Sequence, residues 1–140
     1  MIGAAKRAMY DELITIWESS VRATHDFITE DYLQEIKSLL PGILPQVNLV
    51  VYREDDKVVG FAGVAAQKLE MLFILPAHMG KGIGKTLLLY CIGQLQVNAV
   101  DVNEQNKQAT GFYQKMGFTV YNRKPLDGMG KPYPILEMKL

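Results

Sequence analysis

The sequence lacks several features that would place a protein in a specialised class. Its single cysteine, Cys91, excludes an internal disulfide and a zinc site built from cysteines. No run of eighteen apolar residues is present, so no transmembrane helix is expected. Fifteen basic and fifteen acidic residues cancel, which leaves no general charge to attract nucleic acid or an anionic membrane. No secretory signal pattern is recognisable, and we therefore expect a cytoplasmic protein that binds neither nucleic acid nor membrane.

What the sequence does contain is the composition of a globular protein, with 49% hydrophobic and 21% charged residues in a chain of 140. That length suits one domain, residues 1–140, with one hydrophobic core. Cys91 lies within an apolar helical pattern and is interpreted as a small core residue. No internal repeat or low-complexity linker divides the chain.

Hydrophobic periodicity and turn residues predict an alternation of helices and strands. Residues 1–8 are expected to hold no more than a short edge strand, and Pro41, Gly42 and Pro45 are expected to end the second helix. A strand–helix–strand unit around residue 80 requires a right-handed parallel crossover, whereas the hairpins beside it require antiparallel pairs. The fold class is therefore α/β (α+β), a mixed sheet with helices on both faces. The predicted elements are helices at 9–21 and 29–40, strands at 49–53, 58–65 and 67–75, a helix at 85–95, a strand at 98–102, a helix between 106 and 117, and strands at 118–121 and 134–140.

A glycine-rich turn joins the third of the long strands to the helix that follows it. Gly80, Gly82 and Gly84 alternate with Lys81 and Ile83, and an apolar helical pattern begins at once. Glycine lets the backbone approach a ligand closely, and the free N–H groups of a helix N-terminus attract anions. The turn therefore predicts a phosphate site. An ordinary strand-to-helix turn is the alternative, because a short glycine motif is a weak signal.

Spacing excludes two of the three phosphate motifs that this turn resembles. A Walker A loop that ends in Gly84-Lys85-Thr86 needs its first glycine at position 79, which is methionine. A dinucleotide fingerprint starting at Gly80 needs a glycine at position 85, which is lysine. The third pattern, Arg/Gln-x-x-Gly-x-Gly/Ala, fits Gly82 and Gly84, with Met79 at the position of the Arg or Gln.

A second motif lies on the predicted helix between residues 106 and 117. It has the pattern Asn-x-x-Ala-x-x-Phe-Tyr-x-x-x-Gly-Phe, and the matching residues are Asn106, Ala109, Phe112, Tyr113, Gly117 and Phe118. The two motifs together, in this order, resemble those of the GNAT superfamily of acetyl-CoA-dependent N-acetyltransferases. The resemblance covers residues 47–140, and the segments 102–106 and 130–134 look like those of small bacterial stand-alone members.

The resemblance implies a twisted, mostly antiparallel GNAT-like sheet that binds acetyl-CoA and needs no metal. The pantetheine arm of the cofactor would pair with the backbone of the third long strand at a splayed strand end. The pyrophosphate would lie on the N–H groups of residues 79–85, and Asn106 would contact the arm. Met79 removes a side-chain phosphate contact common in the family, but the main-chain cradle does not depend on that side chain. The implied cofactor-binding residues are Leu72, Phe73, Ile74, Met79, Gly80, Lys81, Gly82, Ile83, Gly84, Lys85, Asn106 and Tyr113.

The same resemblance implies catalytic roles. The Tyr113 hydroxyl would be the general acid for the departing thiolate, which a phenol pKa near 10 permits. The acceptor amine needs a base, because an alkylammonium of pKa about 10.4 is neutral in under roughly 0.1% of molecules at pH 7. Glu70, a lone acid in an apolar strand, is the first candidate, and a solvated outward-facing carboxylate is its alternative. His25 is the second candidate, with a structural hydrogen-bonding role as its alternative. Acceptor binding is assigned to His25, Phe27, Glu70 and Tyr133.

We therefore predict an acetyl-CoA-dependent N-acetyltransferase that moves acetyl by direct attack to a primary amine of a small molecule, peptide or protein. A non-catalytic acyl-CoA-binding regulatory module is the main alternative, and the intact Tyr113 argues against it. A nucleotide phosphate-binding protein is the more distant alternative. The sequence does not distinguish between acceptors, nor between a monomer and a homodimer.

Overall fold

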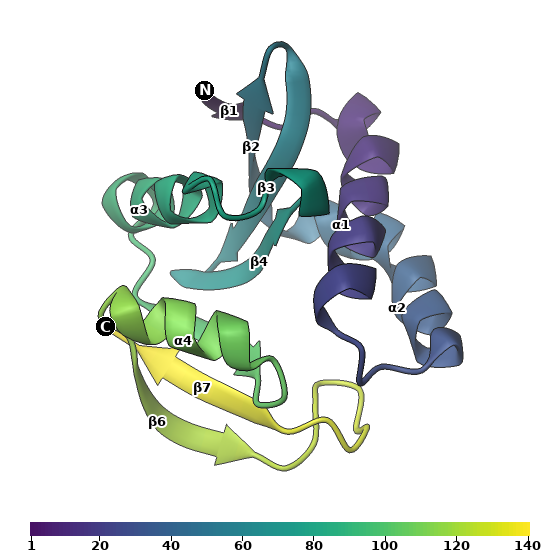
Figure 1. Ribbon diagram of the computed structural model, residues 1–140, viewed down its shortest axis with the longest axis vertical. Helices are drawn as coiled ribbons and strands as arrows, with labels where there is room; N and C mark the ends of the chain where they lie inside the picture. The colour runs from purple at the N-terminus through teal and green to yellow at the C-terminus, as the bar shows by residue number, and fades with distance from the viewer.

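One twisted seven-stranded sheet organises the computed structural model, which describes residues 1–140 (Figure 1). The strand order is β1-β2-β3-β4-β5-β7-β6, and all neighbouring pairs are antiparallel except β4 and β5. The predicted mixed, mostly antiparallel sheet with one parallel crossover is confirmed. The strands are β1 (Ile2–Ala4), β2 (Asn48–Glu54), β3 (Lys57–Ala65), β4 (Lys68–Ile74), β5 (Ala99–Asn103), β6 (Thr119–Lys124) and β7 (Ile135–Lys139). The helices are α1 (Tyr10–Thr24), α2 (Glu30–Ile43), α3 (Ile83–Leu95) and α4 (Lys107–Lys115), with single 3-10 turns at Arg7–Met9, Leu44–Gln46 and Pro76–His78.

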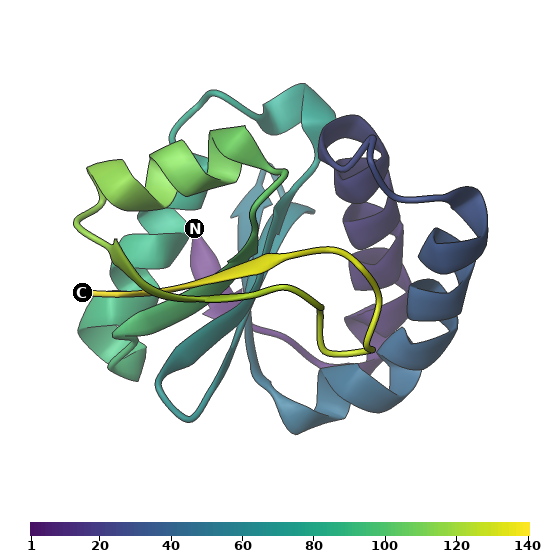
Figure 2. The same ribbon diagram turned by 90° about the horizontal axis from the view of Figure 1, so that it is seen from below.

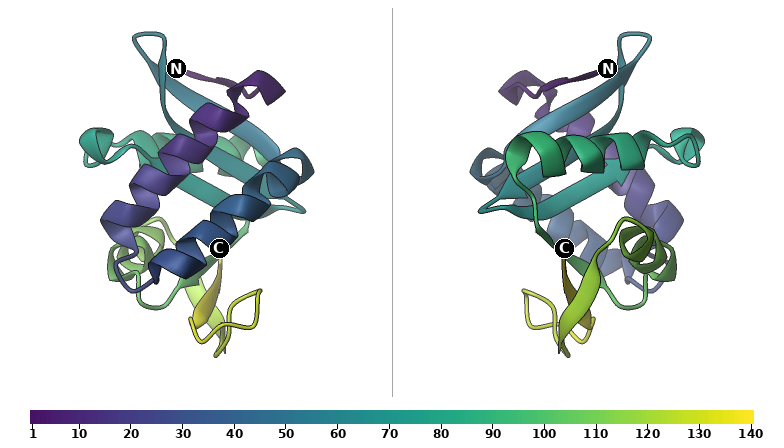
Figure 3. Two further views of the ribbon diagram at one scale, coloured as in Figure 1. Left: turned by 90° about the vertical axis from the view of Figure 1, so that its right-hand side faces the viewer. Right: turned by 90° about the vertical axis from the view of Figure 1, so that its left-hand side faces the viewer.

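Helices cover both faces of the sheet, as predicted (Figures 2 and 3). The apolar stripe of α1, which includes Leu13 and Trp17, packs with α2 on one face against β2, β3 and β4. On the other face α3 and α4 build a second apolar cluster, in which Leu87, Leu88 and Cys91 are fully buried. Burial raises the pKa of the Cys91 thiol to about 11, which agrees with its interpretation as a core residue. No helix has the length and apolar character that a membrane span requires.

The second helix starts as predicted but ends later. Thr29 is its N-cap, and its hydroxyl accepts a hydrogen bond from the Tyr32 N–H at 3.2 Å. The prediction that Pro41 ends the helix is wrong, because α2 continues through it to Ile43. Proline has a φ compatible with a helix, and here it removes only one hydrogen bond near the C-terminus. Burial of Leu40 then holds the last turn against the sheet.

The two parallel strands separate soon after they meet. Only Lys68 with Ala99 and Leu69 with Val100 pair between β4 and β5. Beyond Leu69 the outer edge of β4 has no partner strand, and the sheet opens between its β1–β4 and β5–β7 parts (Figure 1). A ligand with amide groups has access to the unpaired backbone N–H and C=O groups at such an edge.

Gly60 in β3 lies opposite Ile74, the last residue of β4. A Cβ at position 60 would come within 2.6 Å of the Ile74 Cδ1 atom and 3.2 Å of the Phe73 carbonyl oxygen. We expect Gly60→Ala to lower the free energy of unfolding by about 1–3 kcal/mol, because the Ile74 side chain must move aside and the Phe73 carbonyl oxygen must give way slightly to admit the methyl group. Urea denaturation measures this change.

Gly93→Ala is the matched control, because Gly93 lies exposed within α3 and a Cβ there would meet nothing within 4 Å. This substitution should stabilise the protein by about 0.5–1 kcal/mol through the higher helix propensity of alanine. Equal stability of the two variants would show that the close approach at Gly60 has no energetic consequence.

Candidate active site

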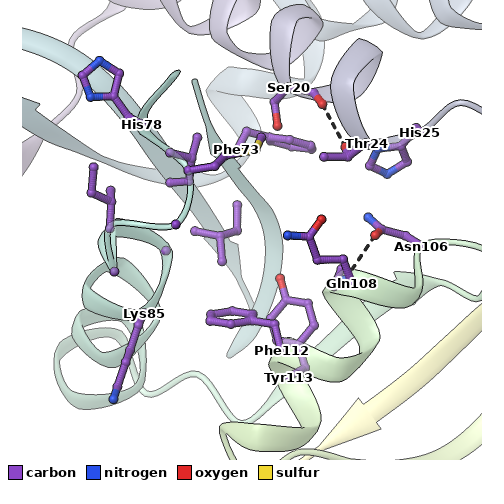
Figure 4. Close-up of a pocket in the computed structure, with 18 residues that line it drawn as sticks. Ser20, Thr24, His25, Phe73, His78, Lys85, Asn106, Gln108, Phe112 and Tyr113 are labelled. Carbon is purple, nitrogen blue, oxygen red and sulfur yellow. Dashed lines mark hydrogen bonds between the residues drawn. The ribbon is translucent and has the colours of Figure 1, made fainter. Parts of the chain in front are cut away.

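A cavity of about 400 Å³ lies between the end of β4, the N-terminal ends of α3 and α4, and the C-terminal end of α1 (Figure 4). It brings together all the predicted cofactor-binding residues except Lys81. The Lys81 side chain is half exposed, with its ammonium 3.9 Å from the Glu54 carboxylate. The lining residues are Ser20, Thr24, His25, Leu72, Phe73, Ile74, His78, Met79, Gly80, Gly82, Ile83, Gly84, Lys85, Asn106, Gln108, Ala109, Phe112 and Tyr113.

The glycine turn beside this cavity carries a continuous run of free backbone donors. The backbone N–H groups of residues 80–85 make no hydrogen bond within the protein, whereas the N–H of Met79 donates to the Pro76 carbonyl oxygen at 3.3 Å. Gly80 and Gly82 have φ angles of 78° and 83°, and a Cβ at either position would meet nothing within 4 Å. Free N–H groups at a helix N-terminus suit a phosphate, so this turn is able to hold a pyrophosphate without a side chain from Met79.

The unpaired edge of β4 forms the neighbouring wall of the cavity. Leu72, Phe73 and Ile74 line it, and β4 has no hydrogen-bonded neighbour on that side at these residues. An extended arm with amide groups is therefore able to run from the glycine turn along β4 as an additional strand would.

Tyr113 stands on α4 with its ring in the apolar core and its hydroxyl directed into the cavity (Figure 4). The ring makes edge contacts with Phe112 at 5.2 Å and Phe118 at 5.8 Å between centroids. Burial raises the pKa of the phenol well above its ordinary value, with a smaller contribution from the Cys91 thiol. The hydroxyl therefore stays protonated at neutral pH and is available as a proton donor.

Asn106 has a structural role in addition to lining the cavity. It is the N-cap of α4, and its side-chain oxygen accepts a hydrogen bond from the Ala109 N–H at 3.1 Å. The same capping bond leaves the side-chain NH₂ group without a protein partner, so it is free to donate to a ligand in the cavity.

Three of the four predicted acceptor residues divide between the cavity and an aromatic cluster next to it. His25 lines the cavity, whereas Phe27 and Tyr133 do not. The three rings form a chain, with centroids 5.3 Å apart for His25 and Phe27 and 6.1 Å apart for Phe27 and Tyr133. Tyr133 also stacks on Tyr32 of α2, whose hydroxyl donates to the Asp127 carboxylate and so ties the β6–β7 loop to the helix.

Glu70 lies apart from Tyr113. Glu70 is exposed, and it borders a second, mostly apolar pocket of about 430 Å³ beneath α1 and α2, together with Trp17 and Met71. Burial raises the pKa of the Glu70 carboxyl, and the nearby Lys68 ammonium opposes this shift. Phe73 is the one residue that lines both pockets, so the structure does not bring Glu70 and Tyr113 into a common site.

Several cavity residues were not among the predicted site residues. Ala109 and Phe112 belong to the second motif, so the motif could have identified them as cavity residues. Ser20, Thr24 and Gln108 are small or amide side chains, whose approach to the cavity depends on how α1 and α4 pack. The structure contains no group of three or more His, Cys, Asp or Glu side chains arranged to hold a metal ion.

Comparison with protein families decides between the alternatives left by the sequence. The acetyltransferase (GNAT) domain family matches residues 12–129. The chain belongs to the GNAT acetyltransferase family. The predicted N-acetyltransferase class is thereby confirmed, and the glycine turn at residues 80–84 lies within the matched range.

Individual GNAT relatives agree with this assignment. The peptidyl-lysine N-acetyltransferase YjaB of Escherichia coli K12 is 42% identical over 129 residues, covering 91% of this chain and 88% of YjaB. The solution structure of the apo form of E. coli YjaB superimposes with a TM-score of 0.91 at 39% identity, covering 99% of this chain and 95% of that one. The PaiA N-acetyltransferase of Thermoplasma acidophilum, solved in complex with coenzyme A, has a TM-score of 0.75 at 25% identity, covering 100% and 98% of the two chains.

Proposed function

We propose that this protein transfers the acetyl group of acetyl-CoA to the side-chain amine of lysine residues in proteins or peptides. The 42% identity to a peptidyl-lysine N-acetyltransferase over 91% of the chain is the observation that carries the choice of acceptor. The cofactor is supported by the six successive free N–H groups at residues 80–85 and by the unpaired edge of β4 beside them. Both features lie on the wall of one cavity, which suits a ligand with a pyrophosphate at one end and amide groups along its arm.

Each part of the cavity then has a task in the reaction. Acetyl-CoA, when bound, supplies the acetyl group as an activated thioester. The N–H groups of residues 80–85 would hold its pyrophosphate, the edge of β4 would align its arm, and the Asn106 NH₂ group would donate to that arm. The protonated Tyr113 hydroxyl would give its proton to the thiolate that leaves when the amine bonds to the acetyl carbon.

A panel of acceptors tests the proposed function. We expect release of free CoA thiol with acetyl-CoA and an N-terminally blocked lysine peptide, and mass spectrometry should find the acetyl group on the lysine side chain. The same peptide with arginine in place of lysine is the control and should release no CoA above background. Acetylation restricted to peptide N-termini or to small amines would contradict a lysine acceptor, and calorimetry showing ATP binding without CoA binding would contradict the cofactor.

A further inference from the structure

Residues at the C-terminal end of α1 form a hydrogen-bonded group that the cofactor site does not use. The Thr24 hydroxyl oxygen lies 2.8 Å from the Ser20 carbonyl oxygen and 2.7 Å from Nδ1 of His25. Thr24 and His25 line the same cavity as Tyr113, and Figure 4 shows them across that cavity from the tyrosine.

Proton counting assigns the tautomer of His25. A threonine hydroxyl has a single proton, and the Ser20 carbonyl oxygen is only able to accept, so both contacts are hydrogen bonds only when the Thr24 proton points at Ser20. The Thr24 oxygen then accepts a hydrogen bond from His25, which places an N–H at Nδ1. A neutral imidazole carries one N–H, so the lone pair of His25 lies on Nε2.

The surroundings of His25 favour this neutral form. Burial lowers the pKa of the imidazole, and the neighbouring Asp26 carboxylate opposes the shift with a smaller effect. The uncharged Phe27 ring packs against it. Nε2 makes no hydrogen bond within the protein and is not sealed from solvent, so it is free to accept a proton from a ligand.

We propose that His25 is the general base for the acceptor amine and that Thr24 is a positioning residue that fixes the His25 tautomer. This inference rests on the proposed function. Nε2 takes one proton from the acceptor ammonium, and the amine nitrogen then bonds to the acetyl carbon while the C–S bond breaks. Tyr113 gives its proton to the sulfur and regains one from the new amide nitrogen. The proton on His25 finally leaves to solvent, so that the reaction releases amide, thiol and one proton.

Glu70 is the rival base, and its location argues against it. Glu70 is an exposed residue that borders the separate pocket beneath α1 and α2, whereas His25 and Tyr113 share one cavity. An acceptor amine bound in that cavity would be close both to His25 and to Tyr113, the proposed proton donor for the thiolate.

Nitrogen NMR tests the tautomer without any need for catalysis. The protein has two histidines, so a His78→Gln variant assigns the His25 signals directly. We expect the Nδ1–H tautomer of His25 in the wild type and in Thr24→Ser, and loss of that preference in Thr24→Val. Thr15→Val is the matched control, because Thr15 makes the same bond to a carbonyl four residues earlier on the exposed side of α1. A majority of the Nε2–H form in the wild type would overturn the role of Thr24.

The pH profile of kcat/KM with a lysine peptide tests the base. For the wild type, kcat/KM should fall as the pH drops through the lowered pKa of His25, because protonation of Nε2 removes the base. His25→Gln should lose at least about 10²-fold of kcat/KM at pH 7, and the loss should shrink as the pH approaches the acceptor pKa of about 10.4. Thr24→Val should lose on the order of tenfold, and Thr24→Ser and Thr15→Val should stay close to the wild type.

Calorimetry with CoA checks that each variant retains its fold and cofactor site, and His25→Asn replaces His25→Gln if the latter fails this check. Two results would overturn the proposal. One is a His25 variant that keeps the wild-type kcat/KM and pH profile. The other is a Glu70→Gln variant whose kcat/KM no longer falls at low pH. A wild type that acetylates no amine would overturn the proposed function itself, and the tautomer measurement would still decide the role of Thr24.

Discussion

Replacing Tyr113 with phenylalanine should lower kcat for acetyl transfer by about 10²- to 10⁴-fold while the affinity for CoA stays within a few-fold. The ring and its contacts with Phe112 and Phe118 remain, and only the hydroxyl is removed from the cavity. Burial raises the pKa of this phenol, so the wild-type hydroxyl is protonated throughout the neutral range. The loss should therefore be nearly constant between about pH 6 and 9, unlike the loss expected for His25 variants.

Tyr121→Phe is the control for this substitution, because Tyr121 lies half exposed on β6 away from the cavity. Steady-state kinetics with a lysine peptide should show no change in kcat for it. A thioester whose thiol is more acidic should reduce the defect of Tyr113→Phe, because a weakly basic thiolate needs less help from an acid. Full activity of Tyr113→Phe with every amine acceptor would exclude the tyrosine as the acid.

The second large effect is expected at the glycine turn. Gly82 is the N-cap of α3 with a φ of 83°, a conformation that strongly disfavours a β-branched residue. The left-handed backbone conformation costs about 1–2 kcal/mol for a residue that has a Cβ. Gly82→Val should therefore change the conformation of the turn and move its N–H groups away from the pyrophosphate. We expect the dissociation constant for CoA to rise at least about tenfold, measured by calorimetry, with a much smaller change in kcat at saturating acetyl-CoA.

Gly42→Ala is the matched control, since a Cβ at Gly42 would meet nothing within 4 Å and the residue lies in α2 outside the cavity. Its affinity for CoA should equal that of the wild type. Unchanged CoA affinity in Gly82→Val would mean that the backbone conformation of the turn does not determine phosphate binding, and the anion would then have to be held by side chains such as Lys85.

The order of helices and strands was predictable because it depends on local patterns. The apolar spacing in α1, the cap at Thr29 and the strand–glycine–helix sequence around Gly82 each act within a few residues of the chain. The continuation of α2 through Pro41 to Ile43 was not predictable in this way, because the burial of Leu40 against the sheet outweighs one lost backbone hydrogen bond.

For the site, the sequence by itself indicated the family and the segments that the resemblance assigns to the cofactor. The glycine turn and the Asn106–Tyr113 helix lie on contiguous segments with characteristic spacing, so short-range patterns sufficed to find them. Only the tertiary structure showed which candidate base lies in the same cavity as Tyr113. From the sequence, Glu70 was the first candidate for the base and His25 the second. The packing of α1 over β4 then placed His25 in the cavity with Tyr113 and left Glu70 in another pocket. Such a choice depends on contacts between segments far apart in sequence, and no local pattern records them.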